Sequence, residues 1–197
     1  MHTFRSYLSQ KLTITDEQWE LMLQHFFKKE IKKGDFLLRQ GDVCNYTFFV
    51  DKGLLRSFTI DENGKESILQ FAPENWFISD RSSIYYNHPS DLFIDALEDT
   101  EVIFLKMDFI ENITHIIPAF SCVNDDLLQR HIYFMQKRII LLLSATAQER
   151  YLNFIELYPE LMLRVPQWMI ASYLGITPES LSRVRKDLAT KHFKPQK

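Results

Sequence analysis

The glycines of this sequence are concentrated in one region, which distinguishes that region from the rest of the chain. Four of its five glycines lie between residues 34 and 64, and only Gly175 lies elsewhere. Glycine adopts the backbone conformations that tight turns need, so a cluster of glycines indicates closely spaced turns. Short runs rich in aromatic and β-branched residues alternate with these turns, as is typical of strands. Residues 33–106 are therefore predicted to form an antiparallel β-barrel or sandwich.

One local signal precedes this region and another lies within it. Thr15 and Gln18 form a capping box, and apolar residues then recur at helical spacing as far as Phe26. This pattern predicts a helix over residues 16–28. Further on, Asn63-Gly64 is a strong hairpin signal between two strand-like runs.

The sequence changes to a helical pattern near Met107. Residues 108–116, 119–143 and 147–157 contain no glycine or proline and predict three helices. In the second of these, large apolar residues recur at every seventh position: Phe120, Leu127, Phe134 and Leu141. This spacing is typical of a coiled-coil seam that pairs two subunits. A core helix that packs on its own β region shows the same spacing, so the pattern leaves both interpretations open.

The C-terminal part has the layout of two short helices joined by a tight turn. Residues 167–174 predict the first helix, Gly175 ends it, and Thr177 can cap a second helix that begins at Pro178. The apolar residues of the second helix share one face: Leu181, Val184 and Leu188. This layout fits a helix-turn-helix that reads DNA, and it also fits an αα-hairpin without such a function.

Charge is distributed unevenly along the chain. The whole chain has a formal net charge of −3. From Arg164 onward, however, there are seven basic and two acidic residues, which gives a net charge of +5. The preceding residues therefore carry −8. A basic segment attached to an acidic one favours contact of the C-terminal part with nucleic acid, although a solvated basic tail would show the same imbalance.

Several classes of protein are disfavoured by composition. Cys44 and Cys122 are too few for an iron–sulfur cluster held by four thiolates, and the histidines form no HxH or HExxH motif, so we expect no metal and no cofactor. The β region holds only His88, which argues against a cupin-like enzyme, and no pairing of nucleophile and base indicates any other enzyme. No apolar run is long enough to span a membrane and no signal-peptide core is present, so we expect a cytoplasmic protein without a membrane partner.

The order of these parts resembles the cyclic-AMP receptor/FNR (Crp/Fnr) family of bacterial transcription regulators, and within it members from Bacteroidetes-type bacteria. The segments that carry the resemblance are KKGDFLLRQGD (32–42), FFVDKGLLRSF (48–58), ILQFAPENWFISD (68–80) and IASYLGITPESLSRVRKDL (170–188).

The resemblance implies an α+β fold in three parts. They are an N-terminal jelly-roll β-barrel like a cyclic-nucleotide-binding sensor domain (1–117), a long dimerisation helix (118–143) and a C-terminal helix-turn-helix domain (144–197). Only ATKHFKPQK follows Leu188, so we expect the wing that family members place after the second helix to be short or absent.

One segment departs from the family pattern. Members that bind cyclic nucleotides carry a Gly-Glu pair followed by Arg-Ser or Arg-Thr. The corresponding residues 77–96 contain no glycine, and Ser90 or Asp91 stands where the arginine would be. An anionic ligand would lose its bidentate partner and meet a carboxylate. We therefore expect no cyclic-AMP binding of the family type.

The β region can instead hold a different small-molecule effector or be a filled scaffold without a ligand. An uncharged apolar or aromatic effector would need apolar walls. The candidate residues for such a pocket are Phe71, Trp76, Phe77, Arg81, Tyr85, Tyr86, Phe93 and Met135.

The resemblance also implies a homodimer that binds double-stranded DNA and regulates transcription, with RNA polymerase as a candidate further partner. Glu179 and Arg183 match the family's base-contacting positions and can pair with cytosine and guanine, while Pro178 replaces a residue that is often arginine. The residues expected at the phosphate backbone are Gln167, Thr177, Ser180, Ser182, Arg185 and Lys186. The alternative is a ligand-binding module that signals through protein partners, with the terminal helices as a docking surface and no sequence-specific DNA binding.

Overall fold

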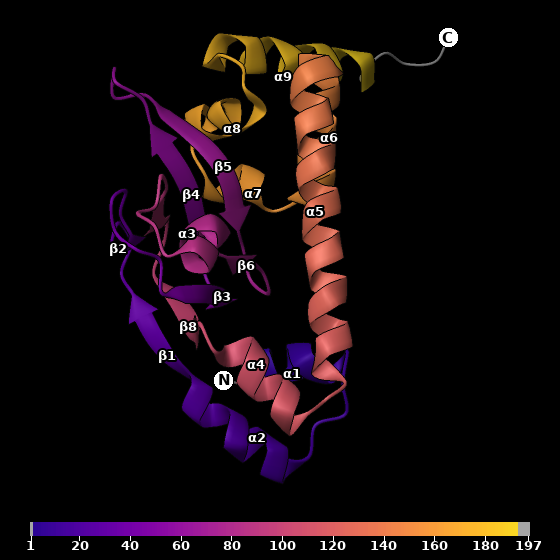
Figure 1. Cartoon of the computed structure of the whole chain (residues 1–197). Helices are drawn as coiled ribbons and strands as arrows, with labels where there is room; N and C mark the ends of the chain where they lie inside the picture. Colours follow the sequence, from indigo (N-terminus) through magenta and orange to yellow (C-terminus); the bar gives the residue numbers. More distant parts are fainter. Residues whose placement is uncertain (1, 193–197) are drawn as a thin grey trace. The chain divides into compact units, whose positions relative to one another are not determined.

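The structure is a computed structural model that describes residues 2–192 (Figure 1). The elements follow in the order α1 (His2–Ser9), α2 (Asp16–Met22), η1 (Leu23–His25), β1 (Phe26–Ile31), β2 (Phe36–Leu38), β3 (Tyr46–Lys52), β4 (Leu55–Ile60), β5 (Glu66–Ala72), β6 (Phe77–Ile78), α3 (Arg81–Tyr86), β7 (Phe93–Ala96), β8 (Thr100–Lys106), α4 (Phe109–Ile116), α5 (Phe120–Ser144), α6 (Ala147–Leu157), α7 (Leu161–Arg164), α8 (Gln167–Leu174) and α9 (Pro178–His192).

The chain forms two compact units. The N-terminal unit contains the residues up to Ile60 together with Leu69–Arg130, and the C-terminal unit contains Asp61–Ile68 together with the residues from His131 onward. Residues 61–68 form the tip of the β4–β5 hairpin. The C-terminal unit therefore combines this hairpin tip, which lies early in the sequence, with the C-terminal helices.

The β region consists of two four-stranded antiparallel sheets, in the orders β1-β8-β3-β6 and β2-β7-β4-β5. Phe48 of β3 lies opposite Phe104 of β8, and Leu55 of β4 lies opposite Ala96 of β7. The predicted antiparallel α+β fold is thus confirmed, but the sheets are not closed into the expected barrel. The strands β2 and β6 span only three and two residues, too few to carry a continuous ladder from one sheet to the other.

Two clusters of apolar side chains support the N-terminal unit. The first joins α1, α2 and α4 to the β1-β8-β3 face, and its centre is Phe4, whose ring lies 5.3 Å from Phe26 and 4.8 Å from Phe49. The second combines residues from both sheets, including Leu55 and Ile94, which are fully buried. Burial from several elements at once fixes the register of the strands.

The helices lie close to their predicted positions, with one exception. The helices α4, α5, α6 and α8 begin and end within one residue of the expected bounds, and the capping box of Thr15 and Gln18 is present. The helix predicted over 16–28, however, ends at Met22, and Phe26 begins β1. Phe26 is buried in the first apolar cluster while its backbone pairs with β8, and this tertiary contact overrides the local helical spacing.

The C-terminal unit packs around three aromatic rings. The ring centroids of Phe154, Tyr158 and Tyr173 lie 5.4–5.8 Å from one another. Ile170 of α8 and Leu181 of α9 are also buried, and these two helices are in contact. This core holds α6, α8 and α9 in one arrangement.

Two glycines of the β region differ in the space around them. Gly53, between β3 and β4, has φ +100°, and a Cβ added there would lie 2.8 Å from the Cα of Thr100 and 2.9 Å from the carbonyl oxygen of Asp99. Gly34 has φ +87°, but nothing lies within 4 Å of an added Cβ. Alanine would strain the backbone at both positions, and at Gly53 the neighbouring backbone would also have to move.

We predict that Gly34→Ala lowers the free energy of unfolding by about 1–2 kcal/mol because alanine disfavours the left-handed conformation. Gly53→Ala should lower it by about 1–3 kcal/mol more, because the added methyl group overpacks a backbone contact. Urea unfolding followed by circular dichroism measures both. Equal losses for the two variants would contradict the contact at Gly53.

Candidate nucleic-acid interface

The turn between α8 and α9 is built as the sequence predicted. Gly175 ends α8 in the left-handed conformation, with φ +65°, and its N–H donates to the carbonyl of Ser172 at 3.0 Å. The hydroxyl of Thr177 accepts a hydrogen bond from the N–H of Ser180 at 3.2 Å and caps α9. The cap and the glycine together set the direction in which α9 leaves the turn.

The outward face of α9 carries charged and hydroxyl groups. Leu181 is buried, and Val184 and Leu188 lie on the same side of the helix. With 3.6 residues per turn, the opposite side presents an exposed set of candidates: Glu179, Ser182, Arg183 and Lys186. We call these four residues the outward row.

Glu179 is held in its ionised form. Its own backbone N–H and the Thr177 hydroxyl, together with the nearby Arg183 charge, lower the pKa of the Glu179 carboxyl below its ordinary value. At neutral pH this side chain is therefore a hydrogen-bond acceptor. The guanidinium of Arg183, one helical turn away, is a donor.

Two residues predicted at the phosphate backbone bind each other. Arg185 lies on the flank of α9, and its Nη1 donates to Oε1 of Gln167 at 2.6 Å. This bond joins α9 to the beginning of α8. The hydroxyl groups of Thr177 and Ser180 likewise lie 3.2 Å apart as part of the cap. These four residues therefore hold the turn in shape in addition to any role toward a ligand.

Two arginines that the sequence analysis did not single out bind the C-terminal end of α8. Arg138 of α5 donates from Nη2 to the carbonyl of Tyr173, and Arg150 of α6 donates from Nη1 to the carbonyl of Leu174, both at 3.0 Å. The Arg138 guanidinium also lies 3.7 Å from the centroid of the Tyr173 ring. Cations at this end of a helix satisfy its last carbonyls and its dipole, so α5 and α6 fix the position of α8.

The tip of the β4–β5 hairpin is bonded to the same helix. The Ser172 hydroxyl donates to the carbonyl of Glu66 at 2.8 Å and accepts from the N–H of Ile68 at 3.1 Å. Arg138 also donates to the carbonyl of Ile68 at 3.0 Å. Ser172 and Ile68 are 104 residues apart, and no local sequence pattern could have indicated this contact.

The residues predicted to line an effector pocket lie in several different packing environments. Phe77 packs on Phe49 in the first apolar cluster, with ring centroids 5.0 Å apart, and Phe93 stacks on Phe58 at 5.2 Å. The others differ in exposure: Phe71 is buried, Trp76 and Arg81 are half-buried, and Tyr85 and Tyr86, whose ring centroids lie 6.3 Å apart, are 78% and 76% exposed. Met135 belongs to the C-terminal unit. Most of these rings fill the core, which is the commoner role of aromatic residues.

A buried carboxylate occupies the segment that departs from the family pattern. Asp80 caps α3, where its carboxylate accepts from the Ser82 hydroxyl at 2.7 Å and the Ser83 N–H at 3.1 Å, and it accepts from the Ser90 hydroxyl at 2.7 Å. Burial alone would raise the pKa of Asp80, but the hydrogen bonds outweigh burial and lower it. An ionised carboxylate at this position repels a phosphate, which gives a physical reason for the expected absence of cyclic-AMP binding.

The predicted seam residues of α5 differ in their burial. Phe120 is buried in the first apolar cluster of its own unit, with its ring 5.8 Å from that of Phe109, so it is not available to a partner subunit and the predicted seam is corrected there. Leu127, Phe134 and Leu141 are half-buried. Other apolar residues of α5 are exposed instead: Ile132, Tyr133, Ile139, Ile140 and Leu143.

The described residues contain neither a membrane-spanning helix nor a cluster of metal ligands. Within residues 2–192 no helix is both long and apolar enough to cross a membrane. The same part of the chain contains no group of three or more histidine, cysteine, aspartate and glutamate residues that could hold a metal ion. The tail after His192 lies outside the described residues, and with it the end of the segment in which we expected a short or absent wing.

We predict that Ser172→Ala frees the hairpin tip. The N–H of Ile68 and the carbonyl of Glu66 each lose a hydrogen bond of about 1 kcal/mol, so the Ile68 amide should exchange with deuterium roughly fivefold faster or more. Hydrogen–deuterium exchange of the peptide that spans residues 61–68 measures this. Ser182→Ala, on the exposed side of α9, is the matched control and should leave exchange at the hairpin tip unchanged; equal rates in all three proteins would contradict the contact.

The sequence of this chain is similar to those of known proteins. The cyclic nucleotide-binding domain family matches residues 28–115. The chain is 29% identical over 168 residues to the anaerobic regulatory protein of Haemophilus influenzae, covering 80% of this chain and 65% of that protein. The fumarate and nitrate reduction regulatory protein of Yersinia pestis is also 29% identical over 168 residues, with 80% and 66% covered. The chain thus spans less than two thirds of the first of these relatives.

A solved structure shows the same fold. FixK2 from Bradyrhizobium japonicum superposes with a TM-score of 0.72 at 20% sequence identity, over 87% of this chain and 88% of that one. The matched domain, the relatives and the order of sheets, long helix and helix-turn-helix agree with one another. The chain has the fold of FixK2 and is similar in sequence to the two regulatory proteins named above.

Proposed function

We propose that the chain is a DNA-binding transcription regulator that acts as a homodimer. The observation that carries the proposal is the outward row of α9, in which an ionised carboxylate and a guanidinium stand side by side on a helix held rigidly by α8. The names of the relatives, which are regulatory proteins, support the same conclusion. RNA polymerase is a candidate partner of such a regulator.

The outward row has the chemistry that the major groove requires. The groove admits an α-helix and presents a different pattern of donors and acceptors for each base pair. Arg183 can donate two hydrogen bonds to O6 and N7 of guanine, and ionised Glu179 can accept from the amino group of cytosine. Glu179 and Arg183 are four residues apart, so their side chains project from the same face of α9.

Contacts to phosphate would come from residues around this row. Lys186 and Ser182 are exposed beside Arg183, and the joined pair of Arg185 and Gln167 lies on the flank of α9. A guanidinium already oriented by Gln167 loses less side-chain entropy when it meets a phosphate. Such contacts set the register of a protein on DNA and do not depend on the base sequence.

Pairing of two subunits would use the exposed side of α5. Ile132, Gln136, Ile139 and Leu143 follow one another at intervals of four, three and four residues, which is the spacing of a coiled-coil seam. Ile132, Ile139 and Leu143 are 46%, 56% and 81% exposed. A second copy of α5 would bury them, and the polar Gln136 among them would specify the register of the pair.

We predict different outcomes for the two basic residues of the outward row. Arg183→Ala should weaken binding to the best duplex by about 1–3 kcal/mol and relax the preference at one base pair, whereas Lys186→Ala should weaken all duplexes alike. Fluorescence anisotropy with a set of duplexes, each altered at one base pair of the preferred site, measures both effects.

The matched control is Lys29→Ala, which removes an exposed lysine from β1 in the N-terminal unit and should change neither affinity nor preference. Uniform weakening by Arg183→Ala and Lys186→Ala alike would refute the assignment of Arg183 to a base. Binding unaffected by either variant would refute the proposed function.

Charge placed in the exposed side of α5 should separate the subunits. We predict that Ile139→Asp converts a dimer into a monomer, because two buried carboxylates would face each other across the pair. Sedimentation equilibrium measures the mass. Leu152→Asp, which changes a 45% exposed leucine of α6, is the control and should remain a dimer. A dimer that survives Ile139→Asp would exclude this surface.

A further inference from the structure

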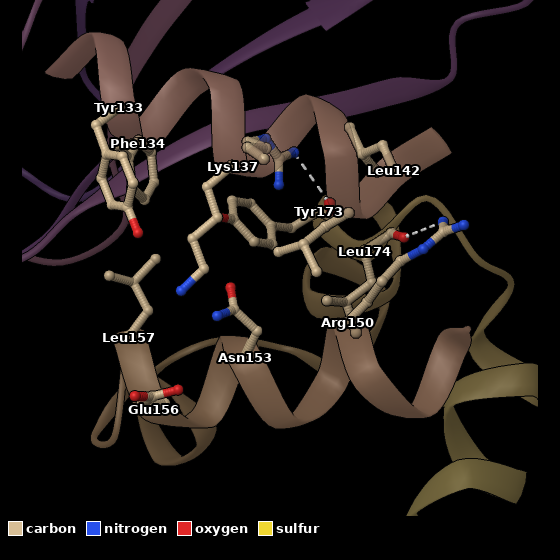
Figure 2. Close-up of a pocket in the computed structure, with 12 residues that line it drawn as sticks. Tyr133, Phe134, Lys137, Leu142, Arg150, Asn153, Glu156, Leu157, Tyr173 and Leu174 are labelled. Carbon is tan, nitrogen blue, oxygen red and sulfur yellow. Dashed lines mark hydrogen bonds between the residues drawn. The ribbon is translucent and has the colours of Figure 1, made fainter. Parts of the chain in front are cut away.

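The C-terminal unit contains a cleft between three helices (Figure 2). Its volume is about 270 Å³, and its walls come from α5, α6 and α8. The apolar side chains that line it include Phe134, Leu141 and Leu142 of α5, Leu157 of α6 and Leu174 of α8. Pockets for small molecules are usually apolar in this way and measure roughly 300–1,000 Å³, so the cleft suits a ligand at the small end of that range.

Polar groups also line the cleft. Lys137 extends from α5 toward Asn153 of α6, as Figure 2 shows. The structure gives the Lys137 ammonium no hydrogen bond and no ion pair within residues 2–192. Arg138 and Arg150 also line the cleft, while Glu156 is the one carboxylate among its described lining residues. The positive charges therefore outnumber the negative ones.

We propose that this cleft is a binding site for a small organic anion with an apolar body, such as an aromatic carboxylate. The ammonium of Lys137 pairs with the anionic group, and the amide of Asn153 donates a hydrogen bond to it. The apolar body lies against Phe134, Leu157 and the ring of Tyr173, where its surface is removed from water.

The proposed subunit contact leaves this site open. Phe134 and Leu141 face the cleft, whereas Ile132 and Ile139, each two residues earlier, belong to the exposed side of α5. Two residues correspond to about 200° around a helix, so the two pairs face nearly opposite directions. A second copy on the exposed side does not cover the cleft.

A ligand bound in the cleft would affect the arrangement of the helices that hold α9. The ligand would touch α5 and α6 on either side of their connection at Ala145–Thr146, and it would touch α8 beside the carbonyls that Arg138 and Arg150 bind. It would thereby favour one arrangement of these helices over others. This regulatory consequence rests on the proposed DNA binding, whereas the binding of the anion does not.

The test uses the full chain without DNA and an aromatic sulfonate, 1-anilinonaphthalene-8-sulfonate, as the probe. We expect saturable fluorescence with one probe per chain. Lys137→Glu should weaken binding roughly tenfold or more, because a charge-assisted contact is replaced by repulsion. Leu157→Trp should weaken it by filling the cleft. Lys29→Glu makes the same change of charge on the exposed surface of β1 and should bind as the parent does.

Circular dichroism of each variant confirms that it is folded. Absence of saturable binding to the parent chain, or equal binding by the parent and both cleft variants, would overturn the proposal. Because no DNA is present, such a result would leave the outcome of the Arg183 and Lys186 experiments unaffected.

Discussion

Two guanidinium groups at the C-terminal end of α8 determine where α9 lies. A helix leaves its last carbonyls without partners, and here those of Tyr173 and Leu174 accept from Arg138 of α5 and Arg150 of α6. Gly175 and the Thr177 cap then fix how α9 leaves α8. The direction of the outward row thus depends on residues that lie well outside the helix-turn-helix.

The same region of the chain combines several tasks. Arg138 binds α8, stacks on Tyr173 and binds the hairpin tip at Ile68, and it also lines the proposed anion site. Ser172 adds two more bonds between α8 and the hairpin tip. A ligand in the cleft or a change at the hairpin would therefore act on one shared set of contacts. Coupling between sites needs such a shared element, whose arrangement both sites bias.

Local signals in the sequence predicted most of the fold but not its long-range contacts. The capping residues Thr15 and Thr177, and Gly175 between the last two helices, act within one turn of the chain, so their roles could be predicted from sequence alone. Apolar spacing, in contrast, shows that a side chain is buried without showing what covers it. Phe26 was expected in a helix and lies in a strand, and Phe120 was expected between subunits and lies in the core of its own unit.

The residues of the candidate site could likewise be predicted only in part from the sequence. Glu179 and Arg183 could be identified because their exposure follows from the period of α9. The pairing of Arg185 with Gln167 and the two bonds at the end of α8 could not, since they join separate helices. The aromatic residues proposed for an effector pocket show the limit most clearly. Their type indicates burial, but Phe77 and Phe93 pack against different partners and Tyr85 is exposed.

The most direct test of this account is to select duplexes from a random DNA pool with the purified chain, without any cyclic nucleotide and at two salt concentrations. A dimer that presents two copies of α9 should recover a two-fold symmetric site, with half-sites about one helical turn apart and an affinity that falls steeply as salt rises. Recovery of no preferred sequence at either salt concentration would contradict the claim that the outward row of α9 reads DNA in the unliganded protein.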